Sequence, residues 1–418
     1  MSVHVSRLKN GLTVATDAMA GVESATVGVW VAAGARHEPA EVNGIAHLLE
    51  HMAFKGTERR SALAIAEEIE AVGGYVNAYT TREHTAYYAR VLAGDVPIAV
   101  DILADILQHS AFDPAELERE RAVILQEIGQ AEDTPDDIIF DHLQLIAFPD
   151  QALGRPILGS PEIIRRLDRE SVRSYMRARY GASSMILVGA GRVDHAALVT
   201  LAERHFADLP AAADLAREPA AFAGGERCED KELEQVHLVL GFSGLAHTDP
   251  DYYAASVYST FIGGGMSSRL FQEVREKRGL VYSVYSFSHS YLDGGLFGIY
   301  AGTGAEQAAE TIRVVAEELA RAREGAAQEE LDRARAQVKA GLLMARESTG
   351  ARAEHLAQQL MIFGRPLPVA EIVAALEGVD RARLQHVAER LTSSPPAFAA
   401  LGPIDRLDAL GTLARALG

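Results

Sequence analysis

The pattern of apolar and polar positions repeats once along the chain. In the first half, an apolar run over residues 27–34 leads through a turn to residues 45–52, where apolar side chains recur at helical spacing. In the second half, an apolar run over residues 235–242 leads in the same way to a helical segment over residues 251–262. We therefore predict a duplicated unit that combines strands and helices, an α+β fold.

The composition changes between residues 208 and 230, where Ala, Pro and Gly predominate, as is typical of a linker. We predict an N-terminal domain over residues 1–207, a linker over residues 208–230 and a C-terminal domain over residues 231–418. Within the C-terminal domain, residues 305–324 and 326–349 are rich in Ala, Glu and Arg and have the apolar spacing of two helices.

Length and composition place the chain among ordinary soluble proteins. Its 418 residues are enough for two or more domains, and its hydrophobic content is 48%. The single cysteine, Cys228, rules out an internal disulfide framework, and we assign it no role. The first residues lack the apolar core of a signal peptide, and no apolar run is long enough to span a bilayer. These features predict a bacterial, cytoplasmic protein that does not act in a membrane.

The formal net charge of −18 bears on the class of partner. Such a charge repels phosphates and argues against a nucleic-acid partner. It favours cationic partners, including basic peptides. The alternative is that the excess acid serves only solubility, and the sequence leaves both open.

The pentapeptide His-Leu-Leu-Glu-His at residues 47–51 is a candidate metal-binding motif. On a helix, positions i, i+3 and i+4 share one face, so His47 and His51 can direct two imidazoles at one metal ion with Glu50 beside them. Two neutral imidazoles and a free carboxylate suit a zinc ion that activates water for hydrolysis. The alternative is a pair of ordinary histidines on a helix surface.

A third ligand must come from elsewhere, and the best candidate segment is residues 113–129. Asp113 followed by Pro114 is a strong helix start signal. Glu120 and Glu127 are seven positions apart, two turns along one face of this helix. One carboxylate could bind the metal while the other contacts a ligand. Alternatively, both are solvated surface charges.

Residues 44–57 resemble the signature of the pitrilysin/insulinase family of zinc peptidases. The resemblance is strongest to the branch that contains the β-subunit of the mitochondrial processing peptidase and its bacterial relatives. In that family the third zinc ligand is a Glu 76 positions after the second His, which implies Glu127, and a further Glu stands seven residues earlier, which implies Glu120. The resemblance thus implies one zinc ion per chain, held by His47, His51 and Glu127. It also implies two homologous domains, each a mainly antiparallel sheet with helices packed on one face.

Other stretches carry the same resemblance, among them residues 132–136 and 154–159, and two more concern the substrate. Residues 73–88 resemble the edge strand of the family, which binds an extended peptide through its backbone. Residues 268–283 resemble an Arg/Tyr element of the second domain that contacts the substrate. The substrate-binding residues implied are Val76, Asn77, Ala78, Tyr79, Arg275 and Tyr282.

The implied activity is that of a zinc-dependent endopeptidase or oligopeptidase, acting on extended peptides or presequence-like segments. Glu50 would act as general base and return the proton to the leaving amine. Tyr282, with Arg275 nearby, would stabilise the developing oxyanion.

Assembly follows from the size of the chain. Longer members of the family have four such domains that enclose the substrate, whereas two are predicted here. The resemblance therefore implies a dimer in which Arg275 and Tyr282 of one subunit complete the zinc site of the other. A homodimer suffices, and a heterodimer with a zinc-less homologue is the alternative.

Two other functions remain open. A non-catalytic scaffold or partner subunit of the same fold is one, although such copies usually lose one of the four residues His47, Glu50, His51 and Glu127. A zinc hydrolase that acts on a non-peptide substrate is the other.

Overall fold

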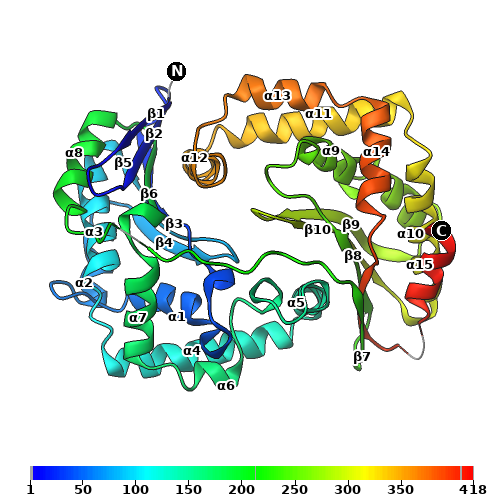
Figure 1. Cartoon of the computed structure of the whole chain (residues 1–418), viewed down its shortest axis with the longest axis horizontal. Coiled ribbons are helices and arrows are strands. Elements are labelled where there is room, and N and C mark those ends of the chain that lie inside the picture. The colour runs from blue at the N-terminus through cyan, green and yellow to red at the C-terminus, as the bar shows by residue number, and fades with distance from the viewer. Residues whose placement is uncertain (1–2, 212, 405–406, 418) are drawn as a thin grey trace. The chain divides into compact units, whose positions relative to one another are not determined.

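The computed structural model describes residues 3–211, 213–404 and 407–417, and its contacts divide the chain into two compact units (Figure 1). Unit 1 contains Met1–Gln130, Arg155–Glu218 and Met344–Pro366. Unit 2 contains Ala131–Gly154, Pro219–Leu343 and Leu367–Gly418.

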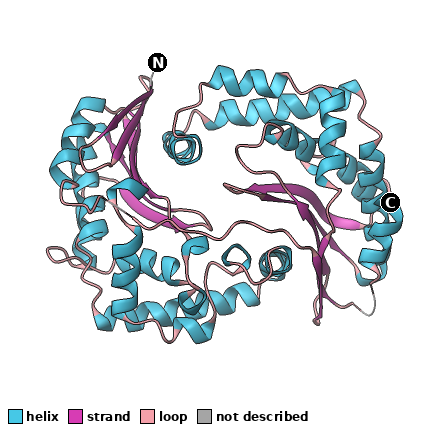
Figure 2. Ribbon diagram, viewed as in Figure 1, coloured by secondary structure: helices cyan, strands magenta, loops and turns pink. Residues whose placement is uncertain are grey.

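Helices and strands succeed one another along both units (Figure 2). The main elements of unit 1 are β1 (Val3–Arg7), β2 (Thr13–Ala18), β3 (Ser24–Val31), α1 (Ile45–Ala53), α2 (Ala62–Glu70), β4 (Tyr75–Thr80), β5 (Thr85–Leu92), α3 (Val96–Gln108), α4 (Pro114–Glu132), α6 (Pro161–Ile164), α7 (Arg169–Arg179), β6 (Met185–Gly191), α8 (His195–His205) and α12 (Thr349–Phe363). Those of unit 2 are α5 (Pro135–Ala147), β7 (Gly225–Asp230), β8 (Val236–Ser243), α9 (Tyr252–Gly263), the π-helical turn η6 (Phe271–Glu276), β9 (Val281–Ser290), β10 (Gly295–Thr303), α10 (Ala308–Arg323), α11 (Gln328–Ala345), α13 (Val369–Glu377), α14 (Arg381–Leu391), β11 (Ala397–Gly402) and α15 (Ala409–Leu417).

The predicted duplication is visible in the order of the strands. The sheet of unit 1 runs β1-β2-β6-β3-β5-β4, and that of unit 2 runs β7-β11-β8-β10-β9. Strand β2 is parallel to β6, as β7 is to β11, and the other neighbours in both sheets are antiparallel. Apart from β1, the two sheets therefore have the same topology, and the α+β fold of two homologous, mainly antiparallel sheets is confirmed.

One face of each sheet is covered by several helices. In unit 1, Val27, Val29 and Val31 alternate along β3 and enter a large apolar core with side chains of α1, α3, α7 and α8. In unit 2, β8 contributes Leu238 and Leu240 to the corresponding core with α9, α10, α14 and α15. This alternation follows the two-residue period of a strand, which directs successive side chains to opposite faces of the sheet.

A single helix covers the opposite face of each sheet, a feature beyond the predicted layer of helices on one face. Helix α12 packs Leu356 and Leu360 against Trp30 and Ile186 of the first sheet. Helix α5 packs Leu143 and its neighbours against β8, β10 and β11 of the second sheet. Both faces of each sheet are therefore buried.

These two helices explain why the units differ from the predicted domains. We expected continuous domains over residues 1–207 and 231–418, whereas residues 131–154 belong to unit 2 and residues 344–366 to unit 1. The apolar face of each helix matches the sheet of the other repeat, and burial of that face decides where the helix belongs. The expected linker over residues 208–230 also differs, because β7 lies within it and pairs with β11.

The predicted helices of the second half are present with one change. Helices α10 and α11 account for most of residues 305–324 and 326–349, but α11 ends at Ala345. The Ser348 side chain then accepts a hydrogen bond from the backbone N–H of Ala351 and caps α12. The N-cap at Ser348 therefore interrupts the helical pattern and starts α12, which belongs to unit 1.

Candidate metal centre

Helix α1 presents an apolar face to the core and a polar face to the candidate site. Ile45, Leu48, Leu49 and Met52 are at most 1% exposed, as their helical spacing predicts. The helix starts after Gly44 and ends at Ala53, which confirms the predicted local helix. His47, Glu50 and His51 consequently lie together on the half-buried opposite face.

Helix α4 brings the two predicted carboxylates to α1. The Asp113 carboxylate accepts hydrogen bonds from the backbone N–H groups of Ala115 and Glu116, so the predicted start of the helix is confirmed. Glu120, 6% exposed, contacts His51, and Glu127 faces both imidazoles. The two-turn spacing thus places both carboxylates at the same helix face.

The three candidate ligands converge on one point. Nε2 of His47 and Nε2 of His51 each lie 3.7 Å from Oε2 of Glu127. These distances exceed a hydrogen bond, and Oε2 of Glu127 is buried without a hydrogen-bond partner among the described residues. Ligands of a tetrahedral zinc ion, bound at about 2.0–2.2 Å, lie about 3.4 Å apart. Two imidazoles and a carboxylate in this arrangement fit a zinc ion with an open fourth position.

The protonation state of His47 is consistent with metal binding. Burial, and secondarily the neighbouring His51, lower the pKa of His47 to about 4. The imidazole is therefore neutral near pH 7, which is the form that binds a metal.

Glu120 fixes the orientation of His51. Its Oε2 atom lies 3.0 Å from Nδ1 of His51, and its Oε1 atom lies 2.7 Å from Nζ of Lys55. A proton on Nδ1 donated to Glu120 leaves the Nε2 lone pair directed toward Glu127. Lys55 was not predicted, although its position one turn after His51 was an available signal.

Glu50 is held by a residue that the sequence analysis also missed. The hydroxyl of Thr80, at the end of β4, donates a 2.6 Å hydrogen bond to Oε2 of Glu50. Burial raises the pKa of Glu50, although the Thr80 hydroxyl and His51 act in the opposite direction. A carboxylate with a raised pKa, beside the candidate ligands, is suited to accept a proton.

Strand β4 forms one edge of the first sheet, as the predicted edge strand requires. Val76 and Ala78 pack on the core beneath the sheet, and Asn77 is exposed. The hydroxyl of Tyr79 accepts a hydrogen bond from Trp30 and donates one to Glu354 of α12. The side chains of β4 are thus held on the two faces of the sheet, and β5 is its one neighbour within the described sheet.

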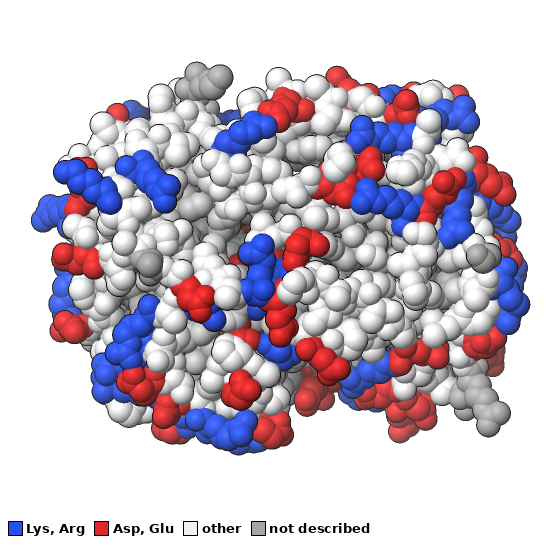
Figure 3. Space-filling model, viewed as in Figure 1, with Lys and Arg blue, Asp and Glu red and all other residues white. Residues whose placement is uncertain are grey.

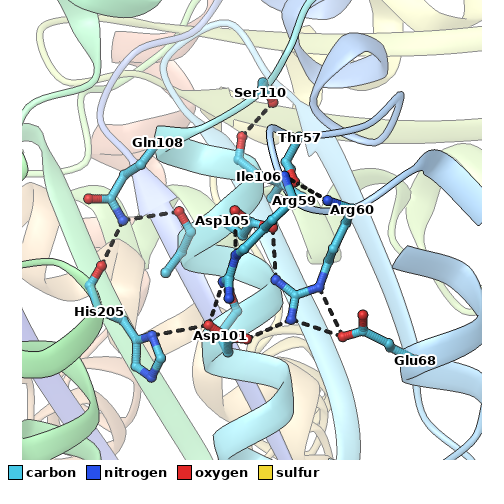
Figure 4. Close-up of polar contacts among 11 residues, drawn as sticks. Thr57, Arg59, Arg60, Glu68, Asp101, Asp105, Ile106, Gln108, Ser110 and His205 are labelled. Atoms are coloured by element: carbon cyan, nitrogen blue, oxygen red, sulfur yellow. Dashed lines mark hydrogen bonds and ion pairs between the residues drawn. The ribbon is translucent and has the colours of Figure 1, made fainter. Parts of the chain in front are cut away.

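The loop after α1 is tied to α3 by an ion-pair network (Figure 4). Both Thr57 and Arg60 bond Oδ2 of Asp105 at 2.8 Å, and Arg60 also reaches Asp101 at 2.6 Å. Although burial acts to raise the pKa of Asp105, the guanidiniums of Arg60 and Arg59 lower it overall. This network anchors the chain just beyond Lys55.

Arg275 and Tyr282 lie in unit 2, whereas the candidate metal ligands lie in unit 1. Arg275 is on η6, and its Cζ atom is 5.5 Å from the ring centroid of Tyr282, at the start of β9. The Tyr282 side chain is 76% exposed. The two residues therefore form a neighbouring pair in which the guanidinium of Arg275 lies beside the exposed ring of Tyr282.

The described residues of unit 2 contain no counterpart of the candidate metal ligands. Helix α9, which follows β8 as α1 follows β3, has the sequence Tyr-Tyr-Ala-Ala-Ser-Val-Tyr-Ser-Thr-Phe-Ile-Gly. Among the described residues, His47, His51 and Glu127 are the one group whose spacing suits a metal ion.

Charged side chains of both signs intermingle on the face of the molecule drawn in Figure 3. Some charged side chains of the protein pair within one helix, such as Arg313 with Glu310 and Glu317. On this face the excess acid is therefore dispersed and forms no single field. Within the described part of the chain, no helix is both long and apolar enough to cross a bilayer.

The fold and the site together define a metallopeptidase, and comparison with known proteins identifies the family. Residues 13–161 match the model described as insulinase, peptidase family M16, and residues 166–338 match the model described as the peptidase M16 inactive domain. The chain belongs to this family of peptidases.

Relatives at the level of the whole chain support the assignment. An uncharacterized zinc protease of Streptomyces coelicolor is 38% identical, with 96% of this chain and 90% of that protein covered. The mitochondrial-processing peptidase subunit beta of Lentinula edodes is 40% identical, with 98% and 92% covered. The crystal structure of a peptidase M16 inactive domain from Pseudomonas fluorescens matches with a TM-score of 0.90 at 22% identity, over 98% of this chain and 100% of that one. At that identity the structural match supports the fold alone.

Proposed function

We propose that this protein is a zinc-dependent endopeptidase or oligopeptidase that hydrolyses extended peptides or presequence-like segments and binds one zinc ion per chain. The observation that carries the proposal is the convergence of His47, His51 and Glu127, with the carboxylate of Glu50 on the same helix face. Several relatives are named zinc proteases, and others are named mitochondrial-processing peptidase subunit beta.

Each side chain of the site has a distinct role in this proposal. Bound zinc would supply a Lewis acid that lowers the pKa of water and polarises the scissile carbonyl. Glu50, held by the Thr80 hydroxyl, accepts the proton of the attacking water and passes it to the leaving amine. Glu120 keeps His51 in the tautomer that binds the metal.

The edge of β4 is the proposed binding site for the substrate backbone. An extended peptide that pairs with residues 76–79 adds a strand to the sheet, with the scissile bond near Glu50 because Thr80 continues the same strand. Main-chain pairing tolerates many sequences, so the preference for particular cleavage sites must come from side-chain contacts.

We also propose a homodimer in which Arg275 and Tyr282 of one subunit donate to the substrate carbonyl at the metal site of the other, with a heterodimer as the alternative. Support comes from the exposure of Tyr282 beside the guanidinium of Arg275. Mixing Glu50→Gln and Tyr282→Phe proteins tests this: recovery of activity in the mixture supports sharing between subunits, and additive activity of the two contradicts it. The location in the bacterial cytoplasm stays a prediction.

The first experiment compares the wild type with Glu50→Gln for zinc content and for cleavage of unfolded peptides. About one zinc per chain in both proteins, with cleavage only by the wild type, is the expected result. Zinc without cleavage by the wild type would favour the non-catalytic scaffold or a missing partner subunit. Absence of zinc from the wild type would contradict the proposed metal site.

A further inference from the structure

The loop between β3 and α1 is buried and holds a carboxylate that the mechanism does not use. Glu38 is 3% exposed, and three N–H groups donate to its side chain. Asn43 Nδ2 and the backbone N–H of Gly44 each lie 2.8 Å from Oε2. The backbone N–H of Ala46 lies 2.8 Å from Oε1. Both carboxylate oxygens are therefore occupied at the start of α1.

Helix α1 needs this carboxylate because it has no N-cap side chain of its own. Its N-cap residue is Gly44, at φ 93°. A Cβ at that position would lie 2.7 Å from the carbonyl oxygen of Leu158 and 2.7 Å from Cδ1 of Ile164. The usual capping residues Ser, Thr, Asp and Asn are thus excluded, and the first N–H groups of α1 require an acceptor from elsewhere.

The backbone around Glu38 is fixed from outside the loop. Arg155 donates to the backbone carbonyl of Glu38 at 2.5 Å, and Asn43 donates to that of Pro156 at 3.1 Å. Arg179 donates to the carbonyl of His37 at 2.9 Å. The donors that reach the Glu38 carboxylate itself are the backbone N–H groups of Gly44 and Ala46 and the side-chain amide of Asn43. All three lie in α1 or in the two residues before it, so the side chain is directed at the start of the helix.

We propose that Glu38 is a positioning residue for the metal centre: its carboxylate caps α1 and holds the first turn of this helix, and with it His47, in the geometry that binds zinc. The inference rests on the metal site of the proposed function. His47 is the residue directly after Ala46, whose N–H bonds Glu38. His51 lies one turn later and is held by Glu120, so loosening the first turn affects His47 first.

Electrostatics support the same role. The positive end of the helix dipole and three N–H donors stabilise an anion at this point. Burial nevertheless raises the pKa of Glu38 to about 7, with the N–H groups of Ala46 and Gly44 acting against it. An ionisable carboxyl is thus retained in a buried place where an apolar side chain could not accept these bonds.

The test measures the zinc affinity of the full-length protein by competition with a chelator at pH 8, together with kcat and KM for an unfolded peptide. Glu38→Gln keeps the size of the side chain but replaces one acceptor oxygen with a donor. Since loss of a group that supports a metal ligand lowers affinity by about 10–100-fold, we expect a fall of this size, with kcat reduced and KM within about twofold of the wild type. Glu41→Gln, an exposed neighbour, should leave all three quantities unchanged.

A second control separates positioning from general stability. Ile102 is fully buried on α3 in the same core. Ile102→Val should lower the unfolding temperature of the zinc-free protein while its zinc affinity stays at the wild-type value. The inference is wrong if Glu38→Gln retains wild-type zinc affinity. It is also wrong if Glu38→Gln and Ile102→Val lower the unfolding temperature equally and lower the zinc affinity equally.

Two further outcomes are informative. Should Glu38→Gln fail to fold, Asn43→Ala removes only one of the three donors and is expected to lower zinc affinity about threefold or more, and unchanged affinity would overturn the inference. A wild-type protein that binds no zinc contradicts the proposed function itself. Wild-type binding with a normal Glu38→Gln contradicts only the role of Glu38.

Discussion

The two units of this protein have one topology and different chemistry. Helices α1 and α9 occupy equivalent places after β3 and β8, and each is bonded to the edge strand of its sheet. In unit 1 the bond joins Glu50 to Thr80, whereas in unit 2 it joins Ser259 to Ser286 at 3.1 Å. The comparison shows that the apolar pattern sets the fold, and that a few polar residues on one helix face set the function.

The polar contacts at the start of α1 also differ from those at the start of α9. The start of α1 is bonded by the buried Glu38. At the start of α9, Asp251 instead forms ion pairs with the partly exposed Arg383 and Arg390. Both carboxylates are buried, but the donors to Glu38 are buried N–H groups, whereas the partners of Asp251 are arginines that solvent can screen. The start of the helix with the candidate metal ligands is thus held by buried groups, and the start of its counterpart by partly exposed ones.

The largest effect should come from matched substitutions at the helix-to-strand bonds. Glu50→Gln should lower kcat by about 10²–10⁴-fold with zinc retained, because a general base contributes about that much. Ser259→Ala, at the comparable place in unit 2, should keep kcat within about twofold. Peptide hydrolysis and metal analysis of both variants measure this difference. Comparable losses in the two would break the functional distinction between the units.

The next effect concerns the exchanged helices α5 and α12, each of which packs on the sheet of the other sequence repeat. Leu143 of α5 is fully buried and Leu356 of α12 is 3% exposed. Substitution of either by Ala should lower the free energy of unfolding by about 2–5 kcal/mol, since each leaves a cavity against a sheet. Leu145→Ala, on the 40% exposed side of α5, should change it by less than about 0.5 kcal/mol. Urea denaturation gives these values, and a small effect at both buried positions would contradict the packing of the exchanged helices.

The exchange marks the limit of what the sequence could predict about the fold. Helix periodicity identifies an apolar face but contains no information on which of two similar sheets it will cover. For this reason the duplication, the α+β class and α1 were predictable, whereas the membership of α5 and α12 was not.

The site shows the same limit at finer scale. The histidines, Glu50, Glu120 and Glu127 follow from helical spacing and family resemblance. Glu38 and Thr80 act from a loop and a strand end, and Glu38 bonds backbone N–H groups, so neither follows a periodic pattern. Such contacts become visible only when the chain is folded.

A smaller effect on the free energy of unfolding is expected from His37, in the turn before α1, and from His247, in the matching turn before α9. Burial, and then Arg179, Arg217 and Arg36, lower the pKa of His37 to about 4. Between pH 6.5 and 4 the unfolded chain binds a proton at this residue that the folded chain does not, so the free energy of unfolding decreases as the pH falls. The full contribution, present above pH 6.5, is about 3 kcal/mol.

The variant His37→Asn can still accept from the Gly34 N–H and should show a flatter decrease of unfolding free energy over this range. His247, in the matching turn of unit 2, also has a pKa lowered by burial, but no cations contribute. His247→Asn should therefore flatten the curve less. Urea denaturation of zinc-free protein at several pH values measures both, and parallel curves for wild type and His37→Asn would contradict this account.

The smallest of these effects tests how the metal ligand is supported. Glu120→Gln should lower zinc affinity by about 10–100-fold, because the amide accepts more weakly from Nδ1 of His51 and no longer pairs with Lys55. Lys55→Met leaves the Glu120 carboxylate in place but removes its charged partner, so its loss should be smaller than that of Glu120→Gln. Lys55→Arg, which can still pair with Glu120, should restore most of the affinity. Competition with a chelator distinguishes these cases. If Lys55→Met lowers the zinc affinity and Lys55→Arg lowers it equally, Lys55 acts by packing, and its charge does not help to orient His51.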